Sequence, residues 1–151
     1  MHEHVDFKKQ GFTLIELLIV IAIIAILAAI VIIAINPARQ ISQANNAQRS
    51  ANVTTILNAI GQYAIDNRGV YPAGITATST PICSTGVTST SCIDLAVLTT
   101  NQIYLPTLPS DPLSPNTTST WYFVSKSTST NPRVTVTAPM AELSATISVT
   151  R

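Results

Sequence analysis

The sequence predicts an α+β protein in which one long N-terminal helix precedes and packs on a small antiparallel sheet. Every residue from Leu17 to Ile35 is Leu, Ile, Val or Ala, whereas the rest of the chain is polar and rich in Ser and Thr. Apolar residues then recur at spacings of three and four as far as Ala64, which is the period of an amphipathic helix. Aromatic, β-branched and alternating segments follow between residues 121 and 149 and indicate strands.

The apolar run is predicted to span a membrane. At about 1.5 Å per residue it forms a helix of about 28 Å, close to the hydrocarbon thickness of a bilayer, and it lacks the polar stripe of a soluble helix. A removable secretory signal peptide is the alternative. The run is longer than a usual signal core, and Asn36-Pro37-Ala38-Arg39 is a poor small-residue cleavage site. We therefore expect a retained, single-pass anchor in contact with membrane lipid.

The flanks of the run and the cysteines indicate where the head lies. Lys8 and Lys9 immediately precede the run and favour a cytoplasmic N-terminus, although Arg39 on the far side is a weaker counter-signal. The head then lies outside the cytoplasm, where disulfides persist. Cys83 and Cys92 are nine positions apart in a Ser/Thr-rich segment and are predicted to form one; two unrelated thiols are the alternative. The net charge of +1 does not indicate a nucleic-acid partner.

Glu16 is the only charged residue between Lys9 and Arg39. A carboxylate in a membrane helix is a functional candidate by default, and the alternative is that Glu16 only complements the positive end of the helix dipole. Cleavage between Gly11 and Phe12 would create an α-amino group with a pKa of about 7.7–8.0, which is mostly cationic near neutral pH. Between staggered copies of the helix, this amine and Glu16 would neutralise each other and set the register of the subunits.

The stretch Gly11-Phe12-Thr13-Leu14-Ile15-Glu16, followed by the apolar run, resembles the N-terminal processing motif of type IV prepilins and type II secretion pseudopilins. The resemblance implies that a prepilin peptidase cleaves after Gly11 and that Phe12 is then N-methylated. It implies that Glu16 forms an assembly salt bridge with the N-terminal amine of a neighbouring subunit. It further implies storage in the bacterial cytoplasmic membrane, and extrusion through an inner-membrane assembly platform into a helical filament of this chain, a pilus or pseudopilus.

These observations predict a leader that is cleaved, an anchor and a pilin-like head. Their expected bounds are 1–11 for the cytoplasmic leader, 12–36 for the transmembrane and assembly helix, and 37–151 for the head. Within the head we expect an amphipathic helix to about residue 68, a disulfide loop over 73–119 and a sheet over about 121–150.

One long helix is expected from Phe12 to about Arg68, kinked at Pro37, which removes a backbone donor. Gly69 and Pro72 would end it, and "YAIDNRGVYP" (63–72) resembles the end of this helix in major pseudopilins. Its expected apolar face comprises Ile41, Ala44, Ala47, Ala51, Val53, Ile56, Leu57, Ile60 and Ala64. Its expected polar residues include Gln43, Asn46, Arg49, Asn58 and Asp66.

Three strands are expected after an irregular segment. They are predicted over 121–124, 133–137 and 143–149, with a turn at 129–132 between the first two. The segment 73–119 reads as irregular, apart from a short helix around 93–98 and the cysteine pair.

No catalytic or cofactor site is predicted. Both histidines, His2 and His4, lie in the expected leader, and the carboxylates outside it are too scattered to indicate a dyad. Asp111 is a weak calcium candidate, because "LPSDPLSP" (108–115) resembles the Asp-Pro loop of major pseudopilins, where calcium stabilises the head. Calcium takes about six to eight oxygen ligands, and the acidic loop that would supply them is missing here. We expect Asp111 to bond its own backbone in a turn.

The leading interpretation is a filament subunit, of either a pilus or a secretion pseudopilus. The Tyr-Pro helix exit and the Asp-Pro loop favour the pseudopilin branch, whereas the missing acidic loop and the cysteine pair do not. The alternative is a non-polymerising, membrane-anchored binding protein that uses only the targeting signal. Asn52 and Asn116 lie in N-glycosylation patterns, which are short and often accidental.

Overall fold

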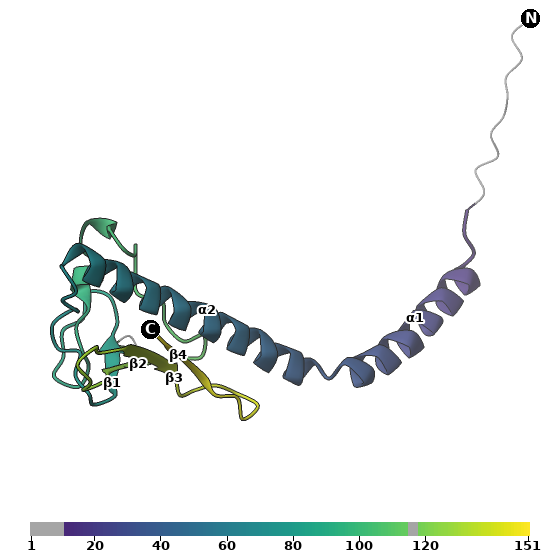
Figure 1. The fold of residues 1–151 in the computed structure, drawn as a ribbon. Helices are drawn as coiled ribbons and strands as arrows, with labels where there is room; N and C mark the ends of the chain where they lie inside the picture. Colours follow the sequence, from purple (N-terminus) through teal and green to yellow (C-terminus); the bar gives the residue numbers. More distant parts are fainter. Residues whose placement is uncertain (1–10, 115–117) are drawn as a thin grey trace, which may run out of the picture. The chain divides into compact units, whose positions relative to one another are not determined.

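The computed structural model describes residues 11–114 and 118–151 (Figure 1). It divides into two compact units, residues up to Gln40 and Ile41–Arg151, and each is described by itself. The elements are α1 (Leu14–Ile35), α2 (Pro37–Asp66), β1 (Thr80–Cys83), two 3₁₀ turns η1 (Ala96–Leu98) and η2 (Thr100–Gln102), β2 (Ser119–Lys126), β3 (Val134–Ala138) and β4 (Ile147–Thr150).

The expectation of one continuous helix was wrong, because the helix stops and restarts at Asn36. Asn36 adopts a left-handed conformation (φ 43°, ψ 77°) that ends α1. Its side-chain Oδ1 accepts a hydrogen bond from the N–H of Arg39 at 3.3 Å, which caps the start of α2. Pro37 is the first residue of α2, where its missing N–H has no helical partner to lose. Pro37 therefore begins a helix instead of bending one.

No residue of α1 is buried in the structure. Its 22 residues would extend about 33 Å along a membrane normal. The helix is long and apolar enough to cross a membrane, and it is the one such helix in the described part of the chain. Its exposed apolar surface therefore needs an apolar environment that the chain itself does not provide.

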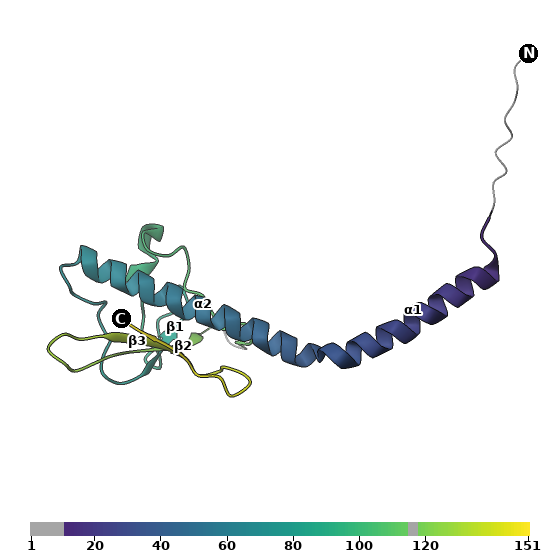
Figure 2. The same cartoon turned by 45° about the vertical axis from the view of Figure 1, so that its right-hand side comes forward.

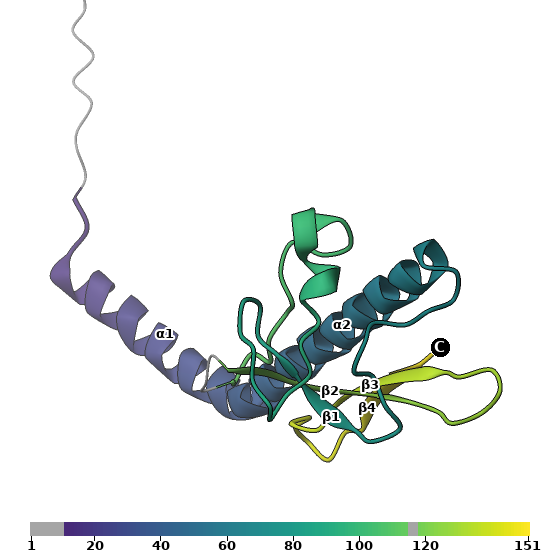
Figure 3. The ribbon, with the colours of Figure 1, turned by 90° about the vertical axis from the view of Figure 1, so that its left-hand side faces the viewer.

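In the unit Ile41–Arg151, α2 lies across one face of a four-stranded antiparallel sheet of order β1-β2-β3-β4 (Figures 1 and 3). The strands alternate, so Tyr122, Val124, Val134 and Val136 turn towards the helix while Trp121 and Phe123 do not. The core cluster is completed from α2 by Val53, Ile56, Leu57, Ala59 and Ile60 and from the 73–108 segment by Ile75, Ile82, Ile93, Leu95, Leu98, Leu105 and Leu108.

The predicted apolar face of α2 was correct only in the second half of the helix. Ile41, Ala44, Ala47 and Ala51 are exposed, whereas Arg49, which was placed on the polar face, is 0% exposed. The face that packs on the head is therefore polar near the start of α2 and becomes apolar from Val53 onward.

The cysteine pair forms the predicted disulfide, with the Cα atoms of Cys83 and Cys92 5.1 Å apart. Its setting was not predicted, because Cys83 ends a strand, β1, inside the segment expected to be irregular. Backbone hydrogen bonds join β1 to the segment around Ile93: Ile93 N–H donates to Pro81 O at 2.8 Å, and Cys83 N–H donates to Ile93 O at 2.9 Å. The disulfide and these bonds close one small loop at the edge of the sheet.

Two further sequence expectations need correction. In place of a helix over 93–98, the chain makes only the 3₁₀ turns η1 and η2. The last strand begins at Ile147 instead of residue 143, because Leu143 and Ser144 have left-handed backbones (φ 57° and 55°). They belong to the loop between β3 and β4, visible beside the N-terminal half of α2 in Figures 1 and 2.

Candidate functional site

Gly11 and Phe12, the residues on either side of the predicted cut, are both exposed. A Cβ atom added at Gly11 would meet no atom within 4 Å, so nothing in the described chain requires glycine there. The Phe12 side chain is 89% exposed. The peptide bond between them is therefore open to an enzyme, and any need for glycine arises outside the described chain. Lys8, Lys9 and the rest of the leader before Gly11 lie outside the described residues.

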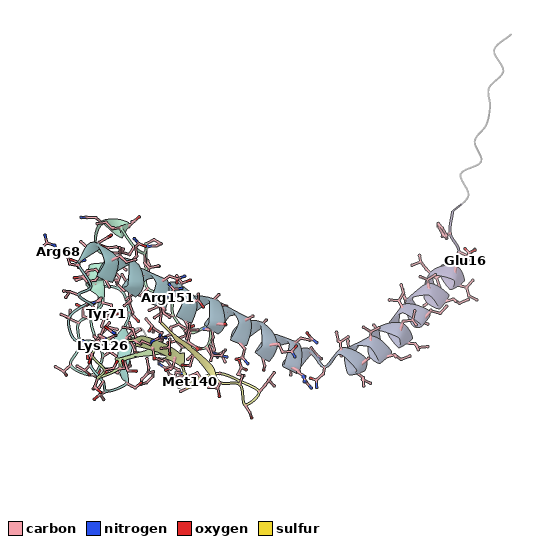
Figure 4. The ribbon with its side chains drawn as sticks, viewed as in Figure 1. Glu16, Arg68, Tyr71, Lys126, Met140 and Arg151 are labelled. Carbon is pink, nitrogen blue, oxygen red and sulfur yellow. A yellow bond between two sulfur atoms is a disulfide. The ribbon has the colours of Figure 1, made fainter. Side chains whose placement is uncertain are left out.

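Glu16 and Thr13 form a reciprocal cap at the start of α1 (Figure 4). Thr13 precedes the helix with an extended backbone (φ −79°, ψ 152°), and its Oγ1 accepts a hydrogen bond from the N–H of Glu16 at 3.3 Å. In return, Glu16 Oε2 accepts hydrogen bonds from the Thr13 N–H at 2.7 Å and from its hydroxyl at 2.8 Å. This is a capping box, which satisfies two backbone donors that the helix itself leaves unpaired.

The cap engages only one oxygen of the Glu16 carboxylate. No described residue donates a hydrogen bond to Oε1, and the nearest basic residue of the sequence, Lys9, lies outside the described part. Glu16 therefore caps its own helix, a role that the sequence interpretation did not include. Its second oxygen has no donor among the described residues, so the cap does not use up the hydrogen-bonding capacity of the carboxylate.

A second polar group lies inside the head, around Arg49. Its guanidinium donates two hydrogen bonds to Asp111, from Nε to Oδ2 at 2.7 Å and from Nη2 to Oδ1 at 3.1 Å. Its Nη1 donates to Glu142 Oε2 at 2.8 Å. The side chains of Arg49 and Asp111 are 0% exposed, and that of Glu142 is 27% exposed. One cation thus joins α2, the segment around Asp111 and the β3–β4 loop.

Glu142 is held by α2 through every polar atom that it carries. Ser42 Oγ donates to Oε1 at 2.9 Å, and Asn45 Nδ2 donates to Oε2 at 2.9 Å. Asn46 receives the Glu142 N–H at 2.9 Å and donates its Nδ2 to the Glu142 carbonyl at 2.8 Å. We call this arrangement of Ser42, Asn45, Asn46, Arg49 and Glu142 the Glu142 clasp.

The clasp and the Arg49–Asp111 pair shift two ionisation equilibria. Hydrogen bonding to Asp111, and then to Glu142, raises the pKa of Arg49 above its ordinary value, although burial opposes the shift. Hydrogen bonds from Arg49, Asn45 and Ser42 hold the pKa of Glu142 below its ordinary value of 4.5. Arg49 and Glu142 are therefore both charged near neutral pH.

Asp111 forms the predicted turn, since its Oδ1 accepts the N–H of Leu113 at 2.9 Å and its carbonyl accepts the N–H of Ser114 at 3.0 Å. Both carboxylate oxygens of Asp111 also accept hydrogen bonds from Arg49. Within residues 11–114 and 118–151, no three His, Cys, Asp or Glu residues gather closely enough to hold a metal ion. Among the described residues, the carboxylate of Asp111 is therefore paired with a guanidinium.

The sequence interpretation did not predict the hydrogen-bonded group of Arg49, Asp111 and Glu142, although the spacing of polar residues on α2 indicated part of it. Ser42, Asn45, Asn46 and Arg49 are spaced by three and four, and the same stripe continues into Val53 and Ile56. The predicted apolar face instead followed the small apolar residues on the neighbouring stripe, which are exposed. The partners, Asp111 and Glu142, lie 62 and 93 positions away in sequence, so no local pattern connects them to Arg49.

Asn52 of the first glycosylation pattern is also used by the fold. Its Nδ2 donates to the hydroxyl of Tyr122 at 2.9 Å and to Ser110 O at 3.3 Å. The second pattern, which begins at Asn116, lies outside the described residues.

Replacing Arg49 with methionine should lower the free energy of unfolding of the 41–151 fragment by about 3–5 kcal/mol, because Asp111 is left buried without its cation. Urea denaturation followed by circular dichroism measures the change. Arg68→Met is the matched control, since Arg68 is exposed, and it should stay within about 0.5 kcal/mol of the parent. Equal losses in the two variants would contradict a special role for Arg49.

The free energy of unfolding of the 41–151 fragment should decrease as the pH falls, and part of this decrease should come from the protonation of Glu142. Because its folded-state pKa is depressed, Glu142 stabilises the fold above its ordinary pKa of 4.5, and this contribution is lost as pH falls through the lower folded-state value. Urea midpoints measured across that range should drop less steeply for Glu142→Gln than for the parent. Identical slopes would show that the clasp does not depend on the charge of Glu142.

Residues 6–35 match a family model described as the prokaryotic N-terminal methylation motif. No characterised protein and no solved structure is significantly similar to the chain. The matched segment contains the exposed Gly11–Phe12 bond and the Thr13–Glu16 cap, and it ends where α1 ends, at Ile35. With the apolar helix, the disulfide and the α+β head, this match supports the predicted resemblance. The chain therefore carries the prepilin-type N-terminal motif of type IV pilins and pseudopilins.

Proposed function

We propose that the chain is a structural subunit that is stored in the bacterial cytoplasmic membrane and polymerises into a pilus or secretion pseudopilus. Prepilin peptidase cleaves between Gly11 and Phe12, Phe12 is N-methylated, and the assembly platform extrudes the subunit into a filament of identical copies. The N-terminal leader, which includes Lys8 and Lys9, faces the cytoplasm, and the head lies outside the cytoplasm. We propose a structural role without catalysis and without a cofactor.

One observation carries this proposal: the processing motif leads directly into an apolar helix that the chain does not cover. Residues 6–35 match the methylation motif, and no residue of α1 is buried. In the stored state lipid covers this surface, and in a filament the corresponding helices of other copies cover it. The motif supports both states because it belongs to precursors that pass from one to the other.

The choice between pilus and pseudopilus rests on the head. The Asp-Pro turn at Asp111 is present, as in the pseudopilin branch, but Arg49 takes the position of a cation beside it. We therefore place the chain in neither branch and propose the function that both share.

A second candidate function is favoured by the Thr13–Glu16 cap. Because Glu16 already has a partner within its own helix, it does not require a neighbouring subunit in order to be retained. The chain would then be a monomeric, membrane-anchored protein whose head binds a partner. The charge and the capping ability of Glu16 must be separated to distinguish the two functions.

Glu16→Gln separates them, because glutamine also completes a capping box but carries no charge. For a filament subunit, this variant should be cleaved and inserted normally, while the filaments recovered by shearing fall at least about tenfold, the factor that corresponds to about 1.4 kcal/mol. Glu16→Ala, which loses both cap and charge, is the comparison. Filament yields from Glu16→Gln that match the parent would favour the monomeric alternative.

Cleavage at the predicted bond is tested by Gly11→Val. Valine adds a branched side chain beside the peptide bond, so the precursor should accumulate in the membrane fraction with its leader attached. Mass spectrometry of the parent chain should find a mature N-terminus at Phe12 carrying one methyl group. Recovery of filaments that begin at Met1 would refute processing at Gly11.

A further inference from the structure

A groove of about 590 Å³ runs beside the C-terminal half of α2, wholly within the unit Ile41–Arg151. On the α2 side it is lined by the amides of Asn58 and Gln62 and by the apolar Ile65, and Arg151 lines it from the end of the sheet. Its volume lies within the range of about 300–1,000 Å³ that ligand-binding clefts occupy. Nothing in the proposed function uses this groove.

Arg151 is exposed, yet α2 holds its side chain in one place. Its Nη1 donates to Asn58 Oδ1 at 2.7 Å, and its stem lies over Gly61, where an added Cβ atom would be 4.0 Å from the Arg151 Cδ. The guanidinium edge formed by Nε and Nη2 has no acceptor among the described residues. Arg49 uses the same edge to bind both oxygens of Asp111. The free edge of Arg151 therefore has the geometry that binds a carboxylate.

The register of the sheet places a second cation on the same face. Lys126 pairs with Val134 of β3, and Val134 exchanges two backbone hydrogen bonds with Arg151, at 2.8 and 2.9 Å. Paired residues of neighbouring strands point to the same face, and Val134 is buried towards α2, so Lys126 and Arg151 also face α2. Their backbones are two strand spacings apart, about 10 Å. The Lys126 Nζ lies 6.0 Å from the centre of the Tyr71 ring, which also lines the groove (Figure 4).

The four carboxylate side chains of the head are engaged elsewhere. They are Asp66, Asp94, Asp111 and Glu142. Two of them bind Arg49, and Asp94 caps η1 by accepting a backbone N–H at 2.8 Å. Burial, and then Asp66, raises the pKa of Tyr104, which places the Asp66 carboxylate at that hydroxyl. None of the four lines the groove, and neither Lys126 nor Arg151 has a salt-bridge partner in the described chain.

We propose that this groove binds an acidic peptide segment of a partner protein. A carboxylate of the peptide accepts hydrogen bonds from Nε and Nη2 of Arg151, and Lys126 supplies a second positive charge. The amides of Asn58 and Gln62 bind the peptide backbone. Ile65, which is 72% exposed, packs against an apolar side chain next to the acidic one. This inference concerns the head alone, so it holds for a filament subunit and for a monomeric anchored protein.

A peptide suits the groove better than a nucleic acid or a second copy of the chain. Two cations neutralise two phosphates, whereas proteins that hold DNA through its backbone make about 6–10 phosphate contacts. The apolar side chains of Ala64 and Ile65 in the groove also suit a peptide side chain better than a phosphodiester backbone. A second copy offers Asp66 and Asp94 as its exposed carboxylates, and both already have partners in their own chain.

The test selects peptides from a random phage-displayed library against the full chain in micelles of an uncharged detergent. The selection runs in parallel on the parent and on Arg151→Gln, which removes the free guanidinium edge. Peptides recovered only on the parent should be enriched in Asp or Glu next to an apolar residue. The dissociation constants of these peptides, made synthetically, are then measured by isothermal titration calorimetry.

Arg151→Gln should weaken binding of the selected peptides at least about tenfold, because the carboxylate loses both of its donors. Arg151→Lys keeps the charge but not the planar fork, so its affinity should lie between the two. Lys126→Gln, on a different strand, should weaken binding by a smaller factor. Urea midpoints equal to that of the parent show that each variant is folded.

Arg133→Gln is the matched control, because it removes the same charge from the same end of the sheet. Arg133 is exposed and precedes Val134, and the alternation of the strand turns it to the face opposite α2. The selected peptides should bind this variant as tightly as the parent. Equal losses in Arg133→Gln and Arg151→Gln would show that general surface charge, and not the groove, attracts the peptides.

Three further outcomes would overturn the proposal. If no acidic peptides are enriched, or if they bind Arg151→Gln as tightly as the parent, the groove does not take a peptide carboxylate. If a single-stranded oligonucleotide binds more tightly than the peptides and displaces them, the partner is a nucleic acid. If the peptides dissociate dimers of the chain in the micelles, as measured by sedimentation, a second copy occupies the groove.

Discussion

A single buried cation determines how the head is assembled. Arg49 has no exposed side-chain surface, and its three guanidinium nitrogens reach Asp111, Glu142 and Asn46. Removing a guanidinium from water is strongly unfavourable unless every donor finds a partner. The segment around Asp111, the β3–β4 loop and α2 therefore each supply a group that the burial of Arg49 requires.

This requirement also explains why the packed face of α2 changes character along the helix. From Val53 onward apolar side chains fill the space against the sheet, where strands provide an apolar surface. Nearer the start of α2, its neighbours are loops, whose backbone groups need hydrogen-bonding partners. Asn45, Asn46 and Arg49 supply those partners, and Asn46 alone binds both the N–H and the carbonyl of Glu142.

The sequence was a reliable guide where local pattern decides structure and a poor one where distant partners do. The apolar run, the β2–β3 hairpin, the disulfide and the Gly11–Phe12 motif follow from neighbouring residues, and each was predicted.

The burial of Arg49 depends on Asp111, 62 positions away, and could not be read from the periodicity of α2. The break at Asn36 was predicted as a kink at Pro37, whereas the Asn36 side chain caps a new helix. β1 is short and gains its order from pairing with β2 and from the Ile93 segment, so its own residues carry little strand signal.

The exposure of α1 along its whole length limits the routes by which the chain could move between environments. Transferring its apolar side chains into water would raise the free energy by tens of kcal/mol, at roughly 1.5–3 kcal/mol for each large side chain. Every transfer must then run directly from one apolar environment to another, without an aqueous intermediate. In the proposed filament, growth and loss would then be confined to the end that touches the bilayer. The directionality of the fibre would thus follow from the solubility of one helix.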